Sequence, residues 1–332
     1  SVSFSAAALD GPSNRAIAVQ ITDSLGLVDS SQAVVEILNV DPTATFATPN
    51  ANINEWEPAS LVFSEASDPG AADTTAGFTY SYDCTGNGWD IENTTASSYS
   101  CLYSDNGVFT AQGRIQDEDG GYTIYSLTIN VDLVAPVADF AISDTEILEG
   151  STSILSFSNP YDPSPEDTAA GFIYSYDCDS DGTWEAAATT EMSYPCIYPD
   201  NGTFTAKARI EDKDGAASDY SGEVIVSNVS PEAEFNNASG VIQEGQSATL
   251  AFNNPSDPSP VDSAAGFLYS YDCTNDGSWE VIDVRDQTYT CVYPDNGTFT
   301  ARGRIQDNDG GANEYTALVS VESVAPTASL EN

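Results

Sequence analysis

The feature that most constrains this chain is an internal sequence repeat. Three nearly identical segments, AGFTYSYDC, AGFIYSYDC and AGFLYSYDC, end at Cys84, Cys178 and Cys273, so the intervals are 94 and 95 residues. A second set of segments, GVFTAQGRIQDEDGG, GTFTAKARIEDKDGA and GTFTARGRIQDNDGG, follows later in each copy. A repeat of this length predicts an array of similar folding units rather than one large core.

The joints between copies predict the domain boundaries. VAP, VSP and VAP mark the joints near Pro136, Pro231 and Pro326. We expect three complete repeats, at residues 43–135 (repeat 1), 136–230 (repeat 2) and 231–325 (repeat 3). Residues 1–42 match the C-terminal half of a repeat, and residues 326–332 match the start of a further one.

Both ends of the sequence fall inside a repeat, and the first residue is Ser1 rather than Met. We therefore expect a mature or excised piece. Two explanations remain open. The chain is a segment of a longer repeat protein, which we favour, or each half-domain is completed by strands from a neighbouring copy.

The side-chain pattern within each repeat is that of β-strands. Apolar and polar residues alternate in TFTAKARIED (203–212) and in GFIYSYDC (171–178), a period of two. No stretch shows sustained helical spacing. Short strands separated by frequent turn signals predict an all-β chain, a tandem array of seven-stranded, immunoglobulin-like β-sandwiches.

The repeats also resemble a known family. YDCDSDG and YPCIYPDNGTFTAKARIEDKDG are similar to the WDFGDG strand and loop, and to the following strand and turn, of PKD-type domains. These immunoglobulin-fold modules occur in tandem in extracellular surface proteins of bacteria and archaea. The resemblance covers all three repeats and both end fragments, and it implies a fold more than a function.

Composition excludes several classes of function. The sequence has 52 acidic and 8 basic residues, a net charge of −44, and no histidine. Phosphate binding requires Lys and Arg clusters, so we expect no nucleic-acid partner, and no apolar run is long enough for membrane insertion. Without histidine, the common acid–base and nucleophilic mechanisms are missing, and we expect no enzyme. The acidity itself suits either cation binding or solvation in a salty habitat.

Six cysteines form one pair in each repeat. Their spacing predicts the disulfides Cys84–Cys101, Cys178–Cys196 and Cys273–Cys291. An even pair per repeat, with no histidine and no CxxC motif, indicates an oxidising, extracellular or cell-surface location. Reduced, buried thiols are the alternative.

An alternating acidic run predicts a calcium site. Asp177, Asp179 and Asp181 precede Gly182 in repeat 2, and Asp272 and Asp276 occupy two of these positions in repeat 3. Calcium prefers several hard oxygen ligands, which alternating aspartates in a turn can supply. The glutamate of an EF-hand is missing, and the same loop in repeat 1 has lost most of its carboxylates. We expect Ca²⁺ to bind most strongly in repeat 2.

The aspartate before each cysteine has a competing role. On the outward face of the sheet, Asp177 is expected to pair with Arg209, and the matching pairs are Asp83–Arg114 and Asp272–Arg304. Five of the eight basic residues share this face of one repeated strand. They either dock an acidic face of another copy or balance charge within the chain.

Two further repeated features concern glycans. Trp89, Trp184 and Trp279 follow the acidic loops, where they either stack on sugars or pack within the protein. Each repeat also contains a candidate N-glycosylation site. Asn201 and Asn296 occupy matching positions in repeats 2 and 3, and Asn93 lies at a different position in repeat 1.

Repetition without chemistry peculiar to one repeat favours a structural role. We expect an extracellular repeat protein that forms a rod, stalk, sheath or filament at the cell surface, stapled by disulfides and stiffened by calcium. Its partners would be further copies of itself or neighbouring repeats of one long chain. The alternatives are an adhesin or carbohydrate-binding array, with glycans as partners, and a spacer of a larger secreted enzyme.

Overall fold

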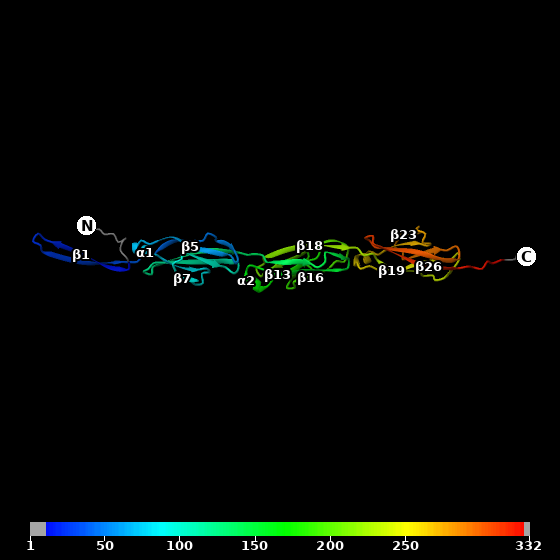
Figure 1. The fold of residues 1–332 in the computed structure, drawn as a ribbon, viewed down its shortest axis with the longest axis horizontal. Coiled ribbons are helices and arrows are strands. Elements are labelled where there is room, and N and C mark those ends of the chain that lie inside the picture. The colour runs from blue at the N-terminus through cyan, green and yellow to red at the C-terminus, as the bar shows by residue number, and fades with distance from the viewer. Residues whose placement is uncertain (1–10, 329–332) are drawn as a thin grey trace. The chain divides into compact units, whose positions relative to one another are not determined.

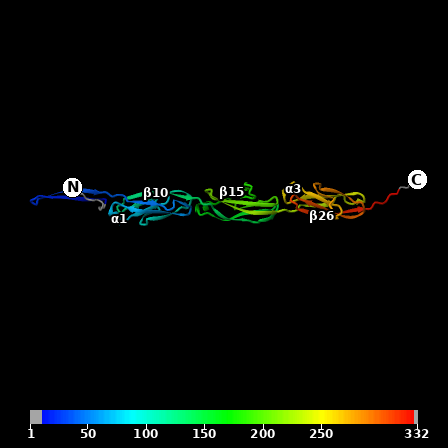
Figure 2. The same cartoon turned by 90° about the horizontal axis from the view of Figure 1, so that it is seen from above.

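The computed structural model describes residues 11–328. The first ten residues of the half-repeat predicted at 1–42, and the last four of the fragment predicted at 326–332, lie outside the described residues. The fold is nearly all-β, and each of the three repeats contains two facing sheets (Figures 1 and 2). The predicted fold class, a tandem array of immunoglobulin-like β-sandwiches, is confirmed.

Each repeat contains eight strands in the same order. The strands of repeat 1 are β3 (Thr43–Ala47), β4 (Asn52–Asn54), β5 (Pro58–Ser67), β6 (Thr79–Asp83), β7 (Ile91–Thr94), β8 (Ser98–Leu102), β9 (Gly107–Gln116) and β10 (Tyr122–Asp132). Those of repeat 2 are β11 (Val137–Ile142), β12 (Glu146–Leu148), β13 (Thr152–Tyr161), β14 (Ile173–Asp177), β15 (Ala186–Thr189), β16 (Ser193–Ile197), β17 (Gly202–Glu211) and β18 (Ala217–Ser227). Those of repeat 3 are β19 (Glu232–Asn237), β20 (Ile242–Gln243), β21 (Ser247–Ser256), β22 (Leu268–Asp272), β23 (Val281–Val284), β24 (Thr288–Val292), β25 (Gly297–Gln306) and β26 (Ala312–Glu322).

The sequence predicted seven strands, and the eighth arises because the first strand is divided between the two sheets. In repeat 1 the three-stranded sheet has the order β3-β5-β8, and the five-stranded sheet has the order β4-β10-β9-β6-β7. β3 pairs with β5 antiparallel, whereas β4 pairs with the last strand, β10, in parallel. Repeats 2 and 3 have the same two orders. Between its first and second strands, each repeat therefore passes from the three-stranded sheet to the five-stranded sheet.

The core of each repeat is built from aromatic side chains. Tyr82, Tyr176 and Tyr271 occupy matching positions and are fully buried. Each Tyr hydroxyl donates a hydrogen bond to a backbone carbonyl; for Tyr82 this is the Ala96 oxygen at 2.9 Å. Burial raises the pKa of all three hydroxyls well above its usual value. Because each hydroxyl keeps a hydrogen-bond partner, burying the large tyrosine ring costs little free energy of desolvation at its polar end.

A pair of phenylalanines beside these tyrosines differs between repeats. The ring centroids are 4.7 Å apart in repeat 1 and in repeat 3, but 5.4 Å apart in repeat 2. The residue on the neighbouring strand is Gly113 in repeat 1 and Gly303 in repeat 3, where a Cβ atom would lie within 2.6 Å of a phenyl ring. Repeat 2 has Ala208 at this position. Its methyl group accounts for the wider separation of the two rings.

Three short helices were not expected from the sequence. They are α1 (Ala71–Ala76), α2 (Pro165–Ala170) and α3 (Pro260–Ala265), one in each repeat. Ser164 and Ser259 cap α2 and α3, with proline in the first turn, which is usual helix-start chemistry. Six residues are too few for a periodic apolar pattern to show. Within the described part of the chain, no helix is long and apolar enough to cross a membrane.

The chain divides into two compact units. Unit 1 comprises residues 1–137, 161–172 and 211–217, and unit 2 comprises residues 138–160, 173–210 and 218–332. Helix α2 and the turn between β17 and β18 therefore pack with repeat 1 in unit 1. Unit 2 contains repeat 3 and the rest of repeat 2. Within it, the Asn228 side chain donates to Asp307, after β25, at 3.0 Å, and Glu149 lies near Asp262 of α3.

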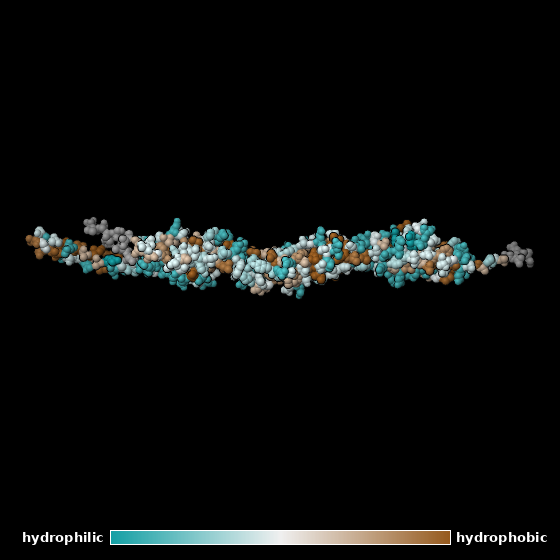
Figure 3. Space-filling view, viewed as in Figure 1, coloured by the Kyte–Doolittle hydropathy of each residue, from teal (hydrophilic) through white to brown (hydrophobic). Residues whose placement is uncertain are grey.

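Residues that precede repeat 1 form a two-stranded hairpin, β1 (Ser13–Thr22) and β2 (Val28–Ile37). Its strands match the last two strands of a repeat, as their sequence indicates. Apolar side chains remain at its surface (Figure 3, blue end in Figure 1). They include Val19, Ile21, Leu25 and Leu27.

Candidate functional site

The acidic loop of each repeat follows the fourth strand of that repeat (β6, β14 or β22), which belongs to the five-stranded sheet, and a disulfide fixes it there. Cys178 lies directly after β14, and Cys196 lies on β16 of the opposite sheet. The disulfides Cys84–Cys101 and Cys273–Cys291 join the same elements in repeats 1 and 3, so all three predicted pairings are confirmed. Each bridge crosses the core and holds one end of the loop between the two sheets.

Two hydrogen bonds secure the backbone around Cys178. The Tyr198 hydroxyl donates to the Cys178 carbonyl at 3.1 Å. The Cys178 N–H donates to Glu185 Oε2 at 2.8 Å. Burial raises the pKa of the Tyr198 hydroxyl to about 12, with a smaller contribution from nearby carboxylates, so this hydroxyl stays protonated and acts as a donor. The sequence reasoning did not identify the role of Glu185.

The aspartates of the loop mainly hold the turn. Asp177 is buried, and its two carboxylate oxygens accept the backbone N–H groups of Ser180 and Gly182. Asp179 accepts the Asp181 N–H at 3.2 Å, and Asp181 accepts the Thr183 N–H at 2.7 Å. Carboxylates that accept main-chain donors in this way stabilise tight turns with or without an ion.

Only part of the predicted calcium site converges. Oxygen atoms of Asp177, Asp179 and Glu185 lie within 4.8 Å of one another. Asp181 is not a member of this group. Three carboxylates of this geometry can hold a cation, but they leave most of the six to eight oxygen ligands of Ca²⁺ to other donors.

The corresponding loop of repeat 3 offers less. Asp272 is fully buried, and its oxygens accept the N–H groups of Thr274, Asp276 and Gly277. Asp276 accepts the Ser278 N–H at 2.8 Å. Asp272 and Asp276 belong to no group of three converging carboxylates among the described residues.

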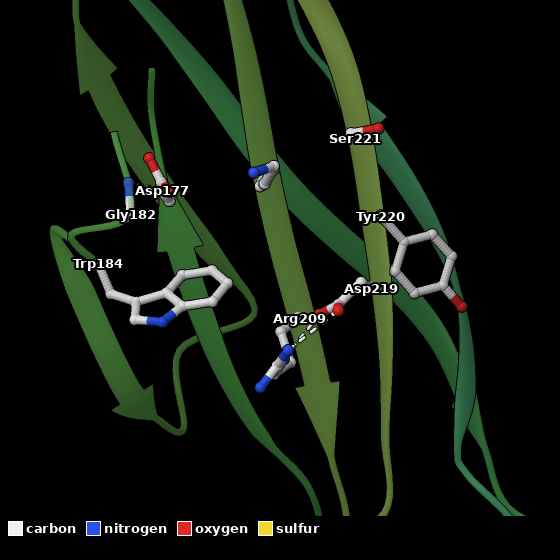
Figure 4. Close-up of a pocket in the computed structure, with 8 residues that line it drawn as sticks. Asp177, Gly182, Trp184, Arg209, Asp219, Tyr220 and Ser221 are labelled. Carbon is white, nitrogen blue, oxygen red and sulfur yellow. Dashed lines mark hydrogen bonds and ion pairs between the residues drawn. The ribbon is translucent and has the colours of Figure 1, made fainter. Parts of the chain in front are cut away.

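A depression of about 290 Å³ lies beside the repeat 2 loop. Asp177 and Gly182 line one side, and Arg209 and Asp219 line the other (Figure 4). The Trp184 ring, which is half-buried, extends from the loop toward the Arg209 side chain (Figure 4). Arg209 forms a two-point ion pair with Asp219 at 2.7 and 2.9 Å.

Each tryptophan packs against an arginine of the outward-facing strand. The guanidinium carbon of Arg114 lies 5.0 Å from the Trp89 ring centroid, that of Arg209 lies 5.6 Å from Trp184, and that of Arg302 lies 4.2 Å from Trp279. Such cation–π contacts stabilise partly exposed aromatic rings. The tryptophans therefore pack within their own repeats, and the arginines cover one side of each ring.

The predicted ion pairs of the aspartate before each cysteine are wrong in repeats 1 and 3. In repeat 2, Arg209 pairs with Asp219, while Asp177 accepts main-chain N–H groups. Arg304 pairs with Asp283 at 2.8 Å, while Asp272 lies 3.4 Å from Arg302. The strand register explains the shift, because Asp272 is opposite Arg302 and Arg304 is opposite Ser270.

In repeat 1 the same register places Asp83 opposite Gln112, and Arg114 pairs with Glu92 at 3.1 Å. The arginines of this strand thus have acidic partners within the chain. This favours charge balance over docking to another copy.

The candidate glycosylation residues lie in two different settings. Asn93 has a positive φ of 52°, and its side-chain oxygen accepts a hydrogen bond from Arg114 at 3.1 Å. Asn201 and Asn296 lie at the turn before β17 and β25, and their N–H groups donate to the preceding aspartates. Glycosylation at all three residues stays a prediction.

A repeated glutamate that the sequence reasoning missed fixes the end of each repeat. Glu55, Glu149 and Glu244 accept the backbone N–H of Val134, Val229 and Val324 at 2.8, 2.7 and 2.9 Å. Each valine is the first residue of a VAP or VSP joint. One glutamate directly after the second strand of each repeat was a detectable signal, but its partner is about 80 residues away in sequence.

No protein-family profile and no curated protein matches this chain. Solved structures that resemble it are tandem β-sandwich arrays. Immunoglobulin domains 1–5 of Sidekick-1 align with 92% of this chain and 66% of that chain, at 10% identity and a TM-score of 0.36. The insect immune protein hemolin aligns over 89% and 79%, at 12% identity and a TM-score of 0.34. Fibronectin(III)-like modules of Clostridium thermocellum CbhA align over 59% and 99%, at 13% identity and a TM-score of 0.23.

Proposed function

We propose that this chain is an extracellular structural repeat protein, a rod, stalk, sheath or filament component at the cell surface, without enzymatic activity. The observation that carries the proposal is that each repeat is closed by the same glutamate–valine hydrogen bond at its joint. A matching disulfide accompanies it in every repeat. Identical construction suits a task that all repeats share.

The disulfides and the charge support a location outside the cell. Disulfides persist in oxidising compartments, and the described residues contain no free cysteine. A net charge of −44 opposes aggregation and attracts cations from the medium. Membership of the PKD type, and association with further copies or with neighbouring repeats, belong to the same proposal.

Calcium at the acidic loop of repeat 2 is part of this proposal. Asp177, Asp179 and Glu185 supply the converging oxygens. Calorimetric titration of the chain and of the D179N/E185Q variant tests it. Equal heats from the two proteins would argue against binding at this loop.

An adhesin or carbohydrate-binding array is the second candidate. The depression beside Trp184 supports it, because this depression combines an aromatic ring with charged hydrogen-bonding groups. A glycan array probed with the chain and with a W184A variant tests this alternative. Binding that is lost in the variant would favour an adhesin over a purely structural role.

Negative-stain electron microscopy of native material, in its source medium, tests the main proposal. Regular assemblies longer than one chain are expected. Repeats that connect to a globular catalytic head would instead indicate a spacer of a secreted enzyme and would contradict the proposal.

A further inference from the structure

Carboxylates also converge in groups that do not include the aspartates of the acidic loops. In unit 2, oxygen atoms of Glu149, Asp200 and Asp262 lie within 4.8 Å of one another; we name these residues the unit 2 cluster. In unit 1 the matching residues are Glu55, Asp105 and Asp167, named the unit 1 cluster, which meet the same criterion. A second group in unit 2, formed by Asp257, Asp262 and Asp307, shares Asp262 with the first.

The unit 2 cluster contains buried oxygens that have no hydrogen-bond partner. Asp262 is 1% exposed, and neither of its carboxylate oxygens is hydrogen-bonded. Glu149 is also 1% exposed; its Oε1 accepts the Val229 N–H, but its Oε2 has no partner. Oδ2 of the neighbouring Asp257 has none either. Buried carboxylate oxygens are nearly always paired or bound to a metal.

The charges around Asp262 are unfavourable. Burial, followed by the nearby carboxylates of Asp309, Asp307, Asp200 and Asp257, raises the pKa of Asp262 to about 6. Burial also raises the pKa of Glu149, against the hydrogen bond from Val229, and Asp257, Asp262 and Asp200 add to the rise. With a pKa of about 6, Asp262 is still largely ionised at neutral pH, so its buried negative charge favours a positive charge beside it.

Unit 1 shows what supplies that charge. Lys213, in the turn between β17 and β18, places its Nζ atom 2.9 Å from Asp105 Oδ1 and 2.9 Å from Asp167 Oδ1. It also contacts Asp214. Hydrogen bonds to these carboxylates raise the pKa of Lys213, although burial opposes them. The ammonium group therefore lies among the carboxylates of the unit 1 cluster.

The matching position in repeat 3 is Asn308, which carries no charge. The geometry of unit 2 is otherwise close-packed. A Cβ atom on Gly150, the residue after Glu149, would lie 2.7 Å from the Pro258 carbonyl oxygen. The segments that carry Glu149 and Asp262 are thus held in close approach, with acidic side chains between them and no lysine.

We propose that a calcium ion binds the unit 2 cluster, held by Glu149, Asp200 and Asp262, and that Lys213 replaces this ion in unit 1. Calcium fits because all three converging side chains are carboxylates, each of which can supply one or two oxygen ligands. Ca²⁺ accepts six to eight such ligands in flexible geometry. Magnesium, which retains most of its water and demands octahedral geometry, suits this dense set of carboxylates less well. The site joins the end of repeat 2 to the start of repeat 3 within one compact unit.

An exchange of the two residues tests the proposal. The 332-residue chain, freed of metal with a chelator, is titrated with CaCl₂ by calorimetry, with D179N/E185Q as the background to remove two of the three converging carboxylates of the repeat 2 loop. N308K is expected to lose one bound Ca²⁺, because its ammonium group fills the unit 2 cluster. K213N is expected to gain one, because it vacates the unit 1 cluster. Unchanged stoichiometry in both variants would overturn the proposal.

A matched pair of glutamate variants provides the control. Glu244 forms the same bond to its joint as Glu149, but it belongs to no group of converging carboxylates among the described residues. E149Q is expected to weaken Ca²⁺ binding at least tenfold, and E244Q to leave it unchanged. Equal weakening in both would assign the effect to the joint rather than to a metal site.

Thermal unfolding gives a second readout that does not depend on calorimetric heats. Calcium at millimolar concentration is expected to raise the melting temperature of the wild-type chain. In the D179N/E185Q background, N308K is expected to melt at a temperature that calcium no longer changes, while remaining folded in chelator. A calcium response in N308K equal to that of wild type would contradict the proposal.

Discussion

At the scale of single residues, the three repeats act as natural variants of one another. Gly113 and Gly303 permit phenylalanine rings 4.7 Å apart, whereas Ala208 accompanies rings 5.4 Å apart. One methyl group thus changes the core by less than 1 Å without changing the fold. Tightly packed interiors respond to such changes because they contain little free volume.

Gly303→Ala is therefore expected to destabilise repeat 3. The new Cβ would lie 2.6 Å from a phenyl carbon of Phe235 and 2.7 Å from one of Phe252, so both rings must move. Overpacking of this kind costs about 1–3 kcal/mol. Urea unfolding measures the change, and Ala208→Gly, which opens a gap in repeat 2, is expected to destabilise as well. A Gly303→Ala chain as stable as wild type would show that the rings adapt freely.

At the scale of elements, the sandwich depends on cross-links between its two sheets. The disulfide of repeat 2 closes a sequence separation of 18 residues, between the end of β14 and β16. The Tyr198 hydroxyl donates a hydrogen bond to the carbonyl of Cys178, which is one of the two cysteines of this disulfide. A covalent and a hydrogen-bonded link therefore meet at Cys178. This point also fixes the start of the acidic loop.

Replacing both Cys178 and Cys196 by serine is expected to lower the free energy of unfolding by about 3 kcal/mol, because a loop of this length gains freedom in the unfolded chain. Scanning calorimetry is the measurement. Treatment of the wild-type chain with a reductant serves as a control and should lower the melting temperature in all three repeats. Unchanged melting after complete reduction would mean that the core alone sustains the fold.

The strands, helices and disulfides also show which parts of the fold could be predicted from the sequence. Alternation in 203–212 predicted β17 correctly, and one cysteine pair per repeat predicted the disulfides, because both signals are local or repeated. Helix α2 was missed because its six residues are too few to show a period. The pairing of Asp272 was wrong because one step of strand register on the same face changes the partner from Arg304 to Arg302.

The unit 1 and unit 2 clusters could not be predicted from the sequence, and the reason is a different one. Glu149 and Asp262 are more than 100 residues apart in sequence and meet only when successive repeats pack. The significance of Lys213 also depends on that packing, since in the sequence it is one charge in the turn DKDG. Only the folded chain shows that it lies beside Asp105 and Asp167.

At the scale of the whole molecule, the excess of acidic residues is the dominant property. A net charge of −44 over 332 residues produces repulsion that opposes compact structure. The eight basic residues already offset the charge of eight of the 52 acidic ones in this figure. Ions in the medium must reduce the remainder.

Added NaCl is therefore expected to raise the melting temperature, measured in the presence of a chelator so that calcium sites stay empty. Screening shortens the Debye length from about 30 Å at 0.01 M to about 10 Å at 0.1 M, which removes most long-range repulsion. Each kcal/mol regained corresponds to roughly 2–4 °C. A melting temperature that falls with salt would indicate that attractive ion pairs such as Arg209–Asp219 dominate instead.

The parallel pairing of β4 with β10 has a consequence for how the chain bears a pulling force. The second and last strands of repeat 1 lie side by side, with Ile53 opposite Val131. Traction on the two ends of a repeat pulls these parallel strands in opposite directions, so their hydrogen bonds are sheared together rather than unzipped one by one. If they yield, the Cys84–Cys101 bridge still withholds 17 residues, about 60 Å of extended chain, from stretching. The sheared strand pair is thus expected to set the force at which a repeat yields, and the disulfide to shorten the extension that follows.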